Sequence, residues 1–371
     1  MDMVEFIKKY WKGALKMEWK ELYEKLVNTD TGRDVDKEEK VEKTRFVAGI
    51  LKDLGFKVEE KDGAFMGIMG NPPYTTLIGH LDTVFPRGEP ERRPFRIEGD
   101  KALGPGVADM KGGIVVLIEA LKKFLEEKGQ GNLCVVLNLD EELGSPWSRK
   151  VFEEVRKDTK YCLSFEPGRE NGSFVSSRRG IASLLIEVAG KKAHASRLDL
   201  GANAILELSL EIPEIYKLNE EFEDLSLNPT LINGGEKSNI TPDKAKVFFD
   251  VRFDSMDSLN ALKERIDSLN TKVKGTSKNF VLEVRRPPMK ESSELVELVR
   301  KVAKDLNMEI SFTGTPGGGD AAFFSEAGVP SLDGFGIPGG NFHSEEEYAL
   351  LNEFENRIKL TVEVLKKLKG E

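Results

Sequence analysis

Apolar residues recur along the first half of the chain with two kinds of spacing, one typical of helices and the other typical of strands. The nearly continuous apolar run at 132–139 is typical of a strand that is covered on both faces. Strands that alternate with helices predict an α/β fold with a mostly parallel sheet flanked by helices. In chain order, the predicted elements are helix 36–54, strand 74–78, helix 113–125, strand 132–139, helix 148–157 and strand 161–165.

The middle of the chain changes to the order strand–helix–strand–strand–helix–strand, which is that of a split βαβ (ferredoxin-like) sandwich. Its predicted elements are strand 180–189, helix 201–218, strands 229–232 and 244–253, helix 255–269 and strand 280–284. After residue 285 the alternation of helices and strands seen in the first half returns, with helix 292–306, strand 309–312, helix 321–327 and a last helix from residue 352. We therefore predict an α/β domain formed by residues 1–172 and 286–371, interrupted by a smaller inserted domain at residues 173–285.

Composition narrows the range of partners and compartments. The 371 residues include 55 basic and 64 acidic side chains, a net charge of −9, which argues against nucleic acid as a partner. No stretch approaches the ~18 apolar residues of a membrane span, and residues 1–26 lack the apolar core of a signal peptide. The two cysteines, Cys134 and Cys162, lie in apolar runs and are too few for a disulfide framework. A cytoplasmic protein is expected.

One of the three histidines, His80, follows directly on a predicted strand and is followed by an aspartate. Residues two apart in an extended chain point to the same face, so Asp82 can reach the His80 ring. A carboxylate on one ring nitrogen fixes the tautomer and leaves the other nitrogen free for a metal. Taken alone, the motif is weak, and coincidence is the alternative.

The glycine-rich segment 104–113 leads into a predicted helix. It differs from a dinucleotide-binding loop because Asp109 replaces the third glycine, and an anion there would repel a pyrophosphate. We interpret Asp109 as a metal ligand held between glycine turns. The alternative is an ordinary charged helix cap.

Carboxylates also follow the two later strands of the first half. Asp140, Glu141 and Glu142 close the apolar strand 132–139, and Glu166 lies just past strand 161–165. Acids at a buried strand end are costly unless a cation or hydrogen bonds neutralise them. We expect one metal ligand and one general base among the acids 140–142, with a solvated acidic turn as the alternative.

Two imidazoles and three carboxylates thus form a candidate metal site, and all but one of them fall at or just beyond predicted strand ends. Nitrogen and oxygen ligands without thiolates suit zinc, cobalt or manganese. Five ligands exceed the needs of one tetrahedral catalytic zinc but suit two metals bridged by a carboxylate. The candidate ligands are His80, Asp109, Glu142, Glu166 and His343.

As a set, these motifs resemble the dizinc metallopeptidase family of glutamate carboxypeptidase, acetylornithine deacetylase, succinyl-diaminopimelate desuccinylase and aminoacylase. The segment 94–101 is most similar to the glutamate carboxypeptidase branch. The motifs that carry the resemblance, in chain order, are His80-Leu81-Asp82-Thr83-Val84, Gly104 to Gly113, Asp140-Glu141-Glu142-Leu143-Gly144, Phe165-Glu166-Pro167, Ala193-His194-Ala195 and His343-Ser344.

For the metal centre, the resemblance implies that Asp109 bridges two metals. His80 and Glu166 would hold one metal, and Glu142 and His343 the other. Further roles are implied for two more acids: Asp82 would orient His80, and Glu141 would be the general base.

For the inserted domain, the resemblance implies a dimer contact and a role for His194 in stabilising the oxyanion in the partner subunit's site. Asn239 and Arg252 resemble the family's contacts to a substrate carboxylate. Gly318 and Gly319 match a substrate-binding loop that often reads Gly-Gly-Thr-Asp, so Gly319 departs from the pattern. Ser196 also departs, since glycine is common at that position.

These observations predict a hydrolase that cleaves the amide bond of a peptide or an N-acyl amino acid carrying a free carboxylate. A hydroxide bridging the two metals would attack the carbonyl, with Glu141 taking the proton. Zinc is the expected metal and a homodimer the expected assembly. The alternatives are an N-acyl amino acid deacylase and a non-catalytic metal-binding scaffold. A nucleotide-binding oxidoreductase is disfavoured by the loop around Asp109.

Overall fold

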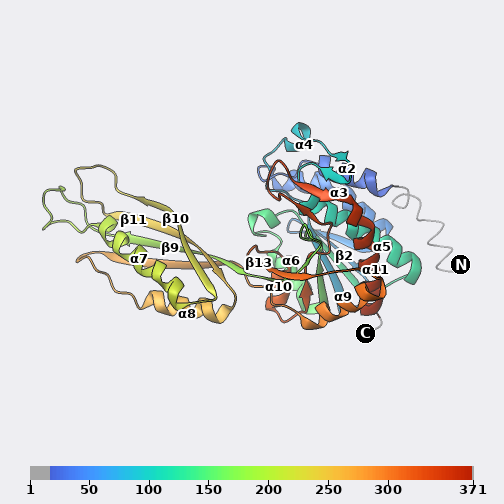
Figure 1. The fold of residues 1–371 in the computed structure, drawn as a ribbon. Coiled ribbons are helices and arrows are strands. Elements are labelled where there is room, and N and C mark those ends of the chain that lie inside the picture. The colour runs from blue at the N-terminus through green and yellow to red at the C-terminus, as the bar shows by residue number, and fades with distance from the viewer. Residues whose placement is uncertain (1–16, 370–371) are drawn as a thin grey trace. The chain divides into compact units, whose positions relative to one another are not determined.

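The computed structural model describes residues 17–369 (Figure 1). It divides into two compact units: unit 1 comprises Met1–Ser177, Met289–Thr315 and Gly319–Glu371, and unit 2 comprises Arg178–Pro288 and Pro316–Gly318. Of the N-terminal segment 1–26, residues 1–16 lie outside the described part of the chain. None of the helices within the described part is both long and apolar enough to cross a membrane.

Unit 1 is built on a six-stranded sheet with the order β1-β2-β6-β3-β7-β14. Strands β6, β3, β7 and β14 run parallel to one another, while β2 pairs antiparallel with both β1 and β6. The sequence-based prediction of a mostly parallel sheet is therefore confirmed. The strands are β1 Lys57–Lys61, β2 Ala64–Met69, β3 Tyr74–His80, β6 Leu133–Asn138, β7 Thr159–Ser164 and β14 Ser331–Leu332.

Alternation along the central strands sends side chains into two separate cores. Leu77 and Val135 pack in one core, and their neighbours Ile78 and Val136 pack in the other. Full burial of one such side chain stabilises the fold by ~1.5–3 kcal/mol. Among the described residues, five helices supply residues to the first core: α2 Trp19–Asn28, α3 Lys37–Asp53, α5 Gly113–Lys128, α9 Ser293–Asp305 and α11 Phe354–Lys369. Two helices supply the second: α6 Arg149–Val155 and α10 Ala321–Glu326.

Two smaller sheets complete unit 1. Strand β8 Phe174–Arg178 pairs with β13 Phe312–Thr315, which begins three residues later than the predicted strand 309–312. The other sheet has the order β15-β16-β5-β4 and consists of very short strands that the apolar pattern does not predict. Its strands are β4 Arg96–Glu98, β5 Lys101–Leu103, β15 Gly339–Gly340 and β16 Tyr348–Leu350, and helix α4 Glu89–Arg92 precedes them.

Unit 2 is an antiparallel sheet with the order β10-β11-β9-β12. Every second residue of β9 is buried, including Leu184 and Ile186, and apolar side chains of α7 and α8 pack in the same core. This confirms the predicted split βαβ sandwich. Its elements are β9 Gly180–Ala189, α7 Ala204–Glu221, β10 Leu225–Gly234, β11 Lys244–Phe253, α8 Met256–Asp267 and β12 Ser277–Arg286.

Candidate metal centre

Three parallel strands of unit 1 end side by side and place candidate ligands at one edge of the sheet. His80 is the last residue of β3 and pairs with Asn138 at the end of β6, while Ile78 pairs with Ser164 at the end of β7. The short turn Glu141–Leu143 follows β6, and Glu166 follows β7. Because parallel strands share the direction of their carboxyl ends, acids far apart in sequence meet at one place.

Asp109 lies between two imidazoles. One of its carboxylate oxygens, Oδ1, is 3.2 Å from Nε2 of His80, and the other, Oδ2, is 3.1 Å from Nε2 of His343. Asp109 comes from the turn before α5, rather than from a strand end as the sequence predicted. His343 comes from the loop between β15 and β16. A carboxylate with one nitrogen donor beside each oxygen has the arrangement of a bridging ligand between two cations.

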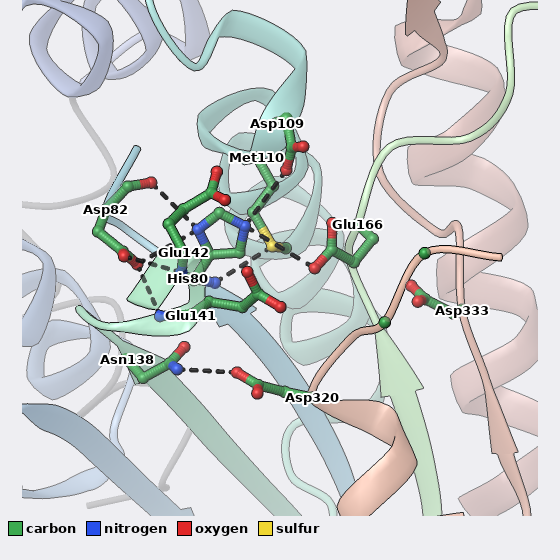
Figure 2. Close-up of polar contacts among 12 residues, drawn as sticks. His80, Asp82, Asp109, Met110, Asn138, Glu141, Glu142, Glu166, Asp320 and Asp333 are labelled. Atoms are coloured by element: carbon green, nitrogen blue, oxygen red, sulfur yellow. Dashed lines mark hydrogen bonds and ion pairs between the residues drawn. The ribbon is translucent and has the colours of Figure 1, made fainter. Parts of the chain in front are cut away.

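The remaining predicted ligands flank these imidazoles. Oε1 of Glu166 is 3.8 Å from Nε2 of His80, and Oε1 of Glu142 is 3.7 Å from Nε2 of His343. Figure 2 shows the carboxyl groups of Asp109, Glu141, Glu142 and Glu166 gathered around the ring of His80. Two groups of three have ligand atoms within 4.8 Å of one another: His80 with Asp109 and Glu142, and His80 with Glu141 and Glu166.

Asp82 ties the His80 ring to the acidic turn. Its Oδ1 is 3.4 Å from Nδ1 of His80, and its carboxylate accepts hydrogen bonds from the backbone N–H groups of Glu141, at 3.2 Å, and Glu142, at 3.1 Å. Asp82 is fully buried. Since its carboxylate and backbone oxygen both face Nδ1, the Nε2 atom of His80 is the nitrogen directed at Asp109.

Crowding of buried acids perturbs their protonation. Burial raises the pKa of Asp109, but hydrogen bonds from His343 and His80 outweigh that effect and hold this pKa far below its usual range. Burial raises the pKa of Glu142 and Glu166 well above the usual value, and the charge of Asp109 adds to the effect. Burial lowers the pKa of His80, but hydrogen bonds to neighbouring carboxylates outweigh it and raise the pKa. A hydrogen bond to Asp109 raises the pKa of His343.

The donor set fits divalent cations. Oε1 of Glu142 is buried and accepts no hydrogen bond within the described structure, so this oxygen lacks the partner that buried polar atoms normally have. A cation between the carboxylates would supply that partner and relieve their mutual repulsion. Five nitrogen and oxygen donors without a thiolate suit zinc, cobalt or manganese.

The three consecutive acids after β6 have different environments. Asp140 accepts hydrogen bonds from the backbone N–H groups of Trp147, at 2.5 Å, and Ser148, at 3.1 Å, so it organises the start of α6. Glu141 and Glu142 face the histidines instead. The carboxylate of Glu141 belongs to the group with His80 and Glu166, which places it beside any cation bound there.

A buried polar network beneath the ligands was missed by sequence reasoning. The side-chain amide of Asn138 donates to Asp320 Oδ2 at 2.8 Å (Figure 2). The Ser145 hydroxyl donates to Asp320 Oδ1 at 2.6 Å. The network fixes the end of β6 against the start of α10. A polar asparagine at the end of an otherwise apolar strand was the available signal.

Four predicted residues belong to unit 2, where their contacts lie within that unit. The exposed His194 accepts or donates a hydrogen bond at 2.8 Å between Nδ1 and the Ser196 hydroxyl. The backbone of Ala195 donates to the carbonyl of Asn239, so His194 and Asn239 lie on neighbouring segments. Ser196, which stands where the family commonly has glycine, thus forms a side-chain hydrogen bond with His194.

Arg252 and the glycine loop are also engaged locally. Arg252 forms a two-pronged ion pair with Asp250, at 2.8 and 3.2 Å, and donates to the carbonyl of Pro316. The carbonyl of Gly318 accepts from the guanidinium of Arg178 at 2.7 Å. Gly319 is the first residue of the last segment of unit 1.

Comparison with known proteins gives the class of this molecule. Residues 76–367 match the model of Peptidase family M20/M25/M40. Carboxypeptidase G2 from Pseudomonas sp. (strain RS-16) is 32% identical over 92% of this chain and 87% of its own. Succinyl-diaminopimelate desuccinylase from Pelagibacter ubique (strain HTCC1062) is 26% identical over 87% of this chain and 92% of its own. The fold is similar to that of aminopeptidase PepT from Bacillus cereus ATCC 10987, with a TM-score of 0.78 and 20% identity, covering 96% and 100% of the two chains.

The fold and the cluster of histidines and acids are those of a metallohydrolase that acts on peptide or other amide bonds. The chain belongs to Peptidase family M20/M25/M40. The family resemblance and the enzyme class predicted from the sequence are thereby confirmed.

Proposed function

We propose that the centre binds two divalent cations, with zinc as the physiological metal. Asp109 would contribute to both positions, with His80 and Glu166 at one and Glu142 and His343 at the other. The position of Asp109 between the two imidazoles carries this proposal, because each of its oxygens has its own nitrogen donor at 3.1–3.2 Å.

When bound, the cations supply Lewis-acid activation of the attacking water and of the scissile carbonyl. Glu141 takes the proton of that water and returns it to the leaving amine. Asp82 holds the His80 ring, and His194 of a second subunit donates to the oxyanion. The closeness of the Glu141 carboxylate to His80 and Glu166 supports the role as base.

The substrate that we propose is a peptide or N-acyl amino acid with a free carboxylate next to the scissile amide, as for a glutamate carboxypeptidase. The relative that is 32% identical over 92% of the chain favours this class. Arg252 and Asn239, with the loop at Gly318 and Gly319, are the proposed carboxylate contacts. Because Asp250 already pairs with Arg252, a substrate carboxylate would exchange with that ion pair.

The second candidate function is an N-acyl amino acid deacylase of the desuccinylase type, which the similarity to a desuccinylase favours. Turnover of N-acyl-glutamates, dipeptides, and N-acetyl and N-succinyl amines should be compared in zinc, cobalt and manganese. Preference for a C-terminal glutamate supports the first function, and preference for the N-succinyl amine supports the second.

The role of Glu141 is tested by the variant Glu141→Gln, which keeps the shape but cannot accept the proton. We expect two cations per chain to remain bound while kcat falls by ~10²–10⁴-fold. Metal content measured by mass spectrometry and single-turnover kinetics check this result. Full activity with both cations present would exclude Glu141 as the base, and loss of one cation would make it a ligand.

We further propose that unit 2 forms a homodimer. Exposed apolar surface of this kind often marks a protein–protein interface. Helix α7 and edge strand β10 expose six large apolar or aromatic side chains: Ile205, Leu206, Leu210, Tyr216, Leu231 and Ile232. Shared sites predict complementation: a mixture of His194→Ala and His80→Ala chains should regain part of the activity that each lacks alone. Absence of rescue in a mixed dimer would show that each subunit works independently.

A cytoplasmic location is also part of the proposal. Both cysteines are free and buried, a state that reducing compartments maintain. Fractionation of cells that produce the protein, with a cytoplasmic marker enzyme as the control, checks this location.

A further inference from the structure

His343 occupies a turn whose backbone is strained. The turn joins β15 to β16, and both Asn341, with φ of 54°, and His343, with φ of 63°, adopt the left-handed conformation that side chains other than glycine rarely take. The His343 side chain is 56% exposed, so packing holds it less firmly than the buried His80. Other contacts must therefore fix the position of this ligand.

The outer side of the turn is held by an exposed ion pair. The carboxylate of Glu345 accepts from the guanidinium of Arg92, with both side chains more than half exposed. Exposed ion pairs contribute only ~0–1 kcal/mol. This ion pair is too weak to set the position of a metal ligand, and a further outer contact is one hydrogen bond from the Arg93 guanidinium to the carbonyl of Glu345.

The inner side of the turn is held by Glu347, the last residue before β16. Its carboxylate is buried and accepts three backbone hydrogen bonds: Oε1 from Ala108 at 2.8 Å and from Asp109 at 2.9 Å, and Oε2 from Gly106 at 3.1 Å. Together these three hydrogen bonds tie the turn to the segment 106–109 through both oxygens of one side chain. A glutamate four residues after one metal ligand thus binds the backbone N–H of another.

The partner segment is shaped to receive this carboxylate. Gly106 has φ of 70°, and a Cβ atom there would lie 2.5 Å from the side chain of Thr83, so the left-handed turn requires glycine. The turn directs the N–H groups of Gly106, Ala108 and Asp109 toward one point, which makes an anion-binding concavity. The hydroxyl of Tyr23 holds the same segment by donating to the carbonyl of Val107 at 2.5 Å.

We propose that Glu347 is a positioning residue that fixes the spacing between Asp109 and His343, and thereby the affinity of the cation position that these two ligands share with Glu142. The proposal rests on the proposed function, since it takes these residues as metal ligands. Glu347 touches the backbone of the bridging ligand and not the cation. Its removal should therefore weaken the His343 position more than the position of His80 and Glu166, because only the first also contains a ligand from the turn that ends at Glu347.

Two variants and a matched control test the proposal. Glu347→Ala removes all three acceptors, whereas Glu347→Gln keeps Oε1 for Ala108 and Asp109 and loses only the acceptor for Gly106. Glu346→Gln is the control, because Glu346 is exposed and its side chain is not part of this contact. Zinc affinity is measured for each of the two positions by competition with a chelator, and amide hydrogen exchange is measured on metal-free protein.

We expect one of the two zinc affinities to fall by ~10–100-fold in Glu347→Ala, less in Glu347→Gln and not at all in the control. Exchange at the amides of Ala108 and Asp109 should rise in the same order in metal-free protein. If Glu347→Ala does not fold, the Glu347→Gln comparison decides alone. The proposal would be overturned by a folded Glu347 variant in which the amides of Ala108 and Asp109 exchange faster but both zinc affinities are unchanged.

The exchange measurement separates this inference from the proposed function. If the wild-type protein binds fewer than two zinc ions, the dinuclear centre is wrong whatever Glu347 does. If the wild type binds two zinc ions and amide exchange is the same in both Glu347 variants as in the wild type, the dinuclear centre stands and the proposed role of Glu347 is wrong.

Discussion

At the scale of single residues, the proposed centre contains two acids that hold candidate ligands in place without being candidate ligands themselves. Asp82 serves His80 and the backbone of the acidic turn together, and Glu347 serves the turn that carries Asp109. Both are acids with backbone N–H partners, so each joins two segments that lie far apart in the sequence. The sequence indicated Asp82 because it stands two residues from a histidine. It could not indicate Glu347, because nothing distinguishes that acid from Glu345 and Glu346.

The variant Asp82→Asn tests this orienting role. The amide oxygen can still accept from a backbone N–H of the acidic turn. The amide N–H₂ group cannot replace the second carboxylate oxygen, because it would face another N–H donor, and the negative charge beside the His80 ring is lost. We expect zinc affinity to fall by ~10–100-fold, as measured by chelator competition. The exposed Asp34→Asn serves as the control, and equal affinities in the two variants would contradict the prediction.

Both thiols should be unreactive in the folded protein. Burial raises the pKa of Cys134 from 9.0 to about 12 and raises that of Cys162 as well, so hardly any thiolate is present at pH 8. We expect alkylation by iodoacetamide at pH 8 to be at least ~100-fold slower in native than in guanidinium-unfolded protein. Because the unfolded thiols lose protons at lower pH, stability should decrease as the pH rises from 9 toward 12. Rapid alkylation of native protein would show that the thiols are accessible.

At the scale of elements, helix α5 begins in direct contact with the segment that carries Glu166. A Cβ atom at Gly113 would lie 1.9 Å from the carbonyl oxygen of Phe165, which no L side chain can tolerate without a backbone shift. The glycine at this position therefore permits the close approach of two backbones, and one of them places a ligand.

Two glycine substitutions in helices should have opposite effects. Gly113→Ala should destabilise the protein by ~1–3 kcal/mol and weaken zinc binding, because Phe165 must move together with Glu166. Gly49→Ala, in the middle of α3 with open space at its Cβ position, should stabilise the protein by ~0.5–1 kcal/mol. Urea unfolding of both variants measures the difference, and a destabilised Gly49→Ala would contradict the account.

The same scale shows which parts of the site a sequence can predict. His80, Glu142 and Glu166 follow strands whose apolar runs are long enough to recognise, and parallel pairing then brings them together. Asp109 and His343 depend on a sheet whose strands are two or three residues long, which is too short for any apolar period. Asp109 and His343 therefore entered the candidate set through their residue types, and the pattern of strands did not predict that they lie beside the other three.

At the scale of the whole molecule, the two-part fold was predictable because each unit has its own rhythm of strands and helices. In unit 2, strand β9 alternates buried residues with half-buried or exposed ones, whereas β6 of unit 1 is buried throughout. The smaller features were not predictable. The antiparallel pair β1 and β2 at the edge of the main sheet has a mixed burial pattern and no distinctive run.

The proposed homodimer predicts that a charge on the edge strand of unit 2 will separate the subunits. Leu231 and Ile232 are each 67% exposed on β10, which is an edge of its sheet. Leu231→Glu should halve the mass measured by light scattering at micromolar concentration. Val281→Glu, also partly exposed but on β12 at the other edge, should leave the mass unchanged. A monomeric wild type would refute the dimer.

The pairing of Ile181 with Arg286 brings the first and last strands of unit 2 together where the chain enters and leaves it. A long insertion whose two ends are neighbours can be accommodated without separating the segments of unit 1 that precede and follow it. A domain inserted in this way can change in length or sequence while the residues of the metal centre keep their positions in unit 1. If unit 2 carries the proposed substrate and dimer contacts, these can diversify while the residues of the metal centre are kept.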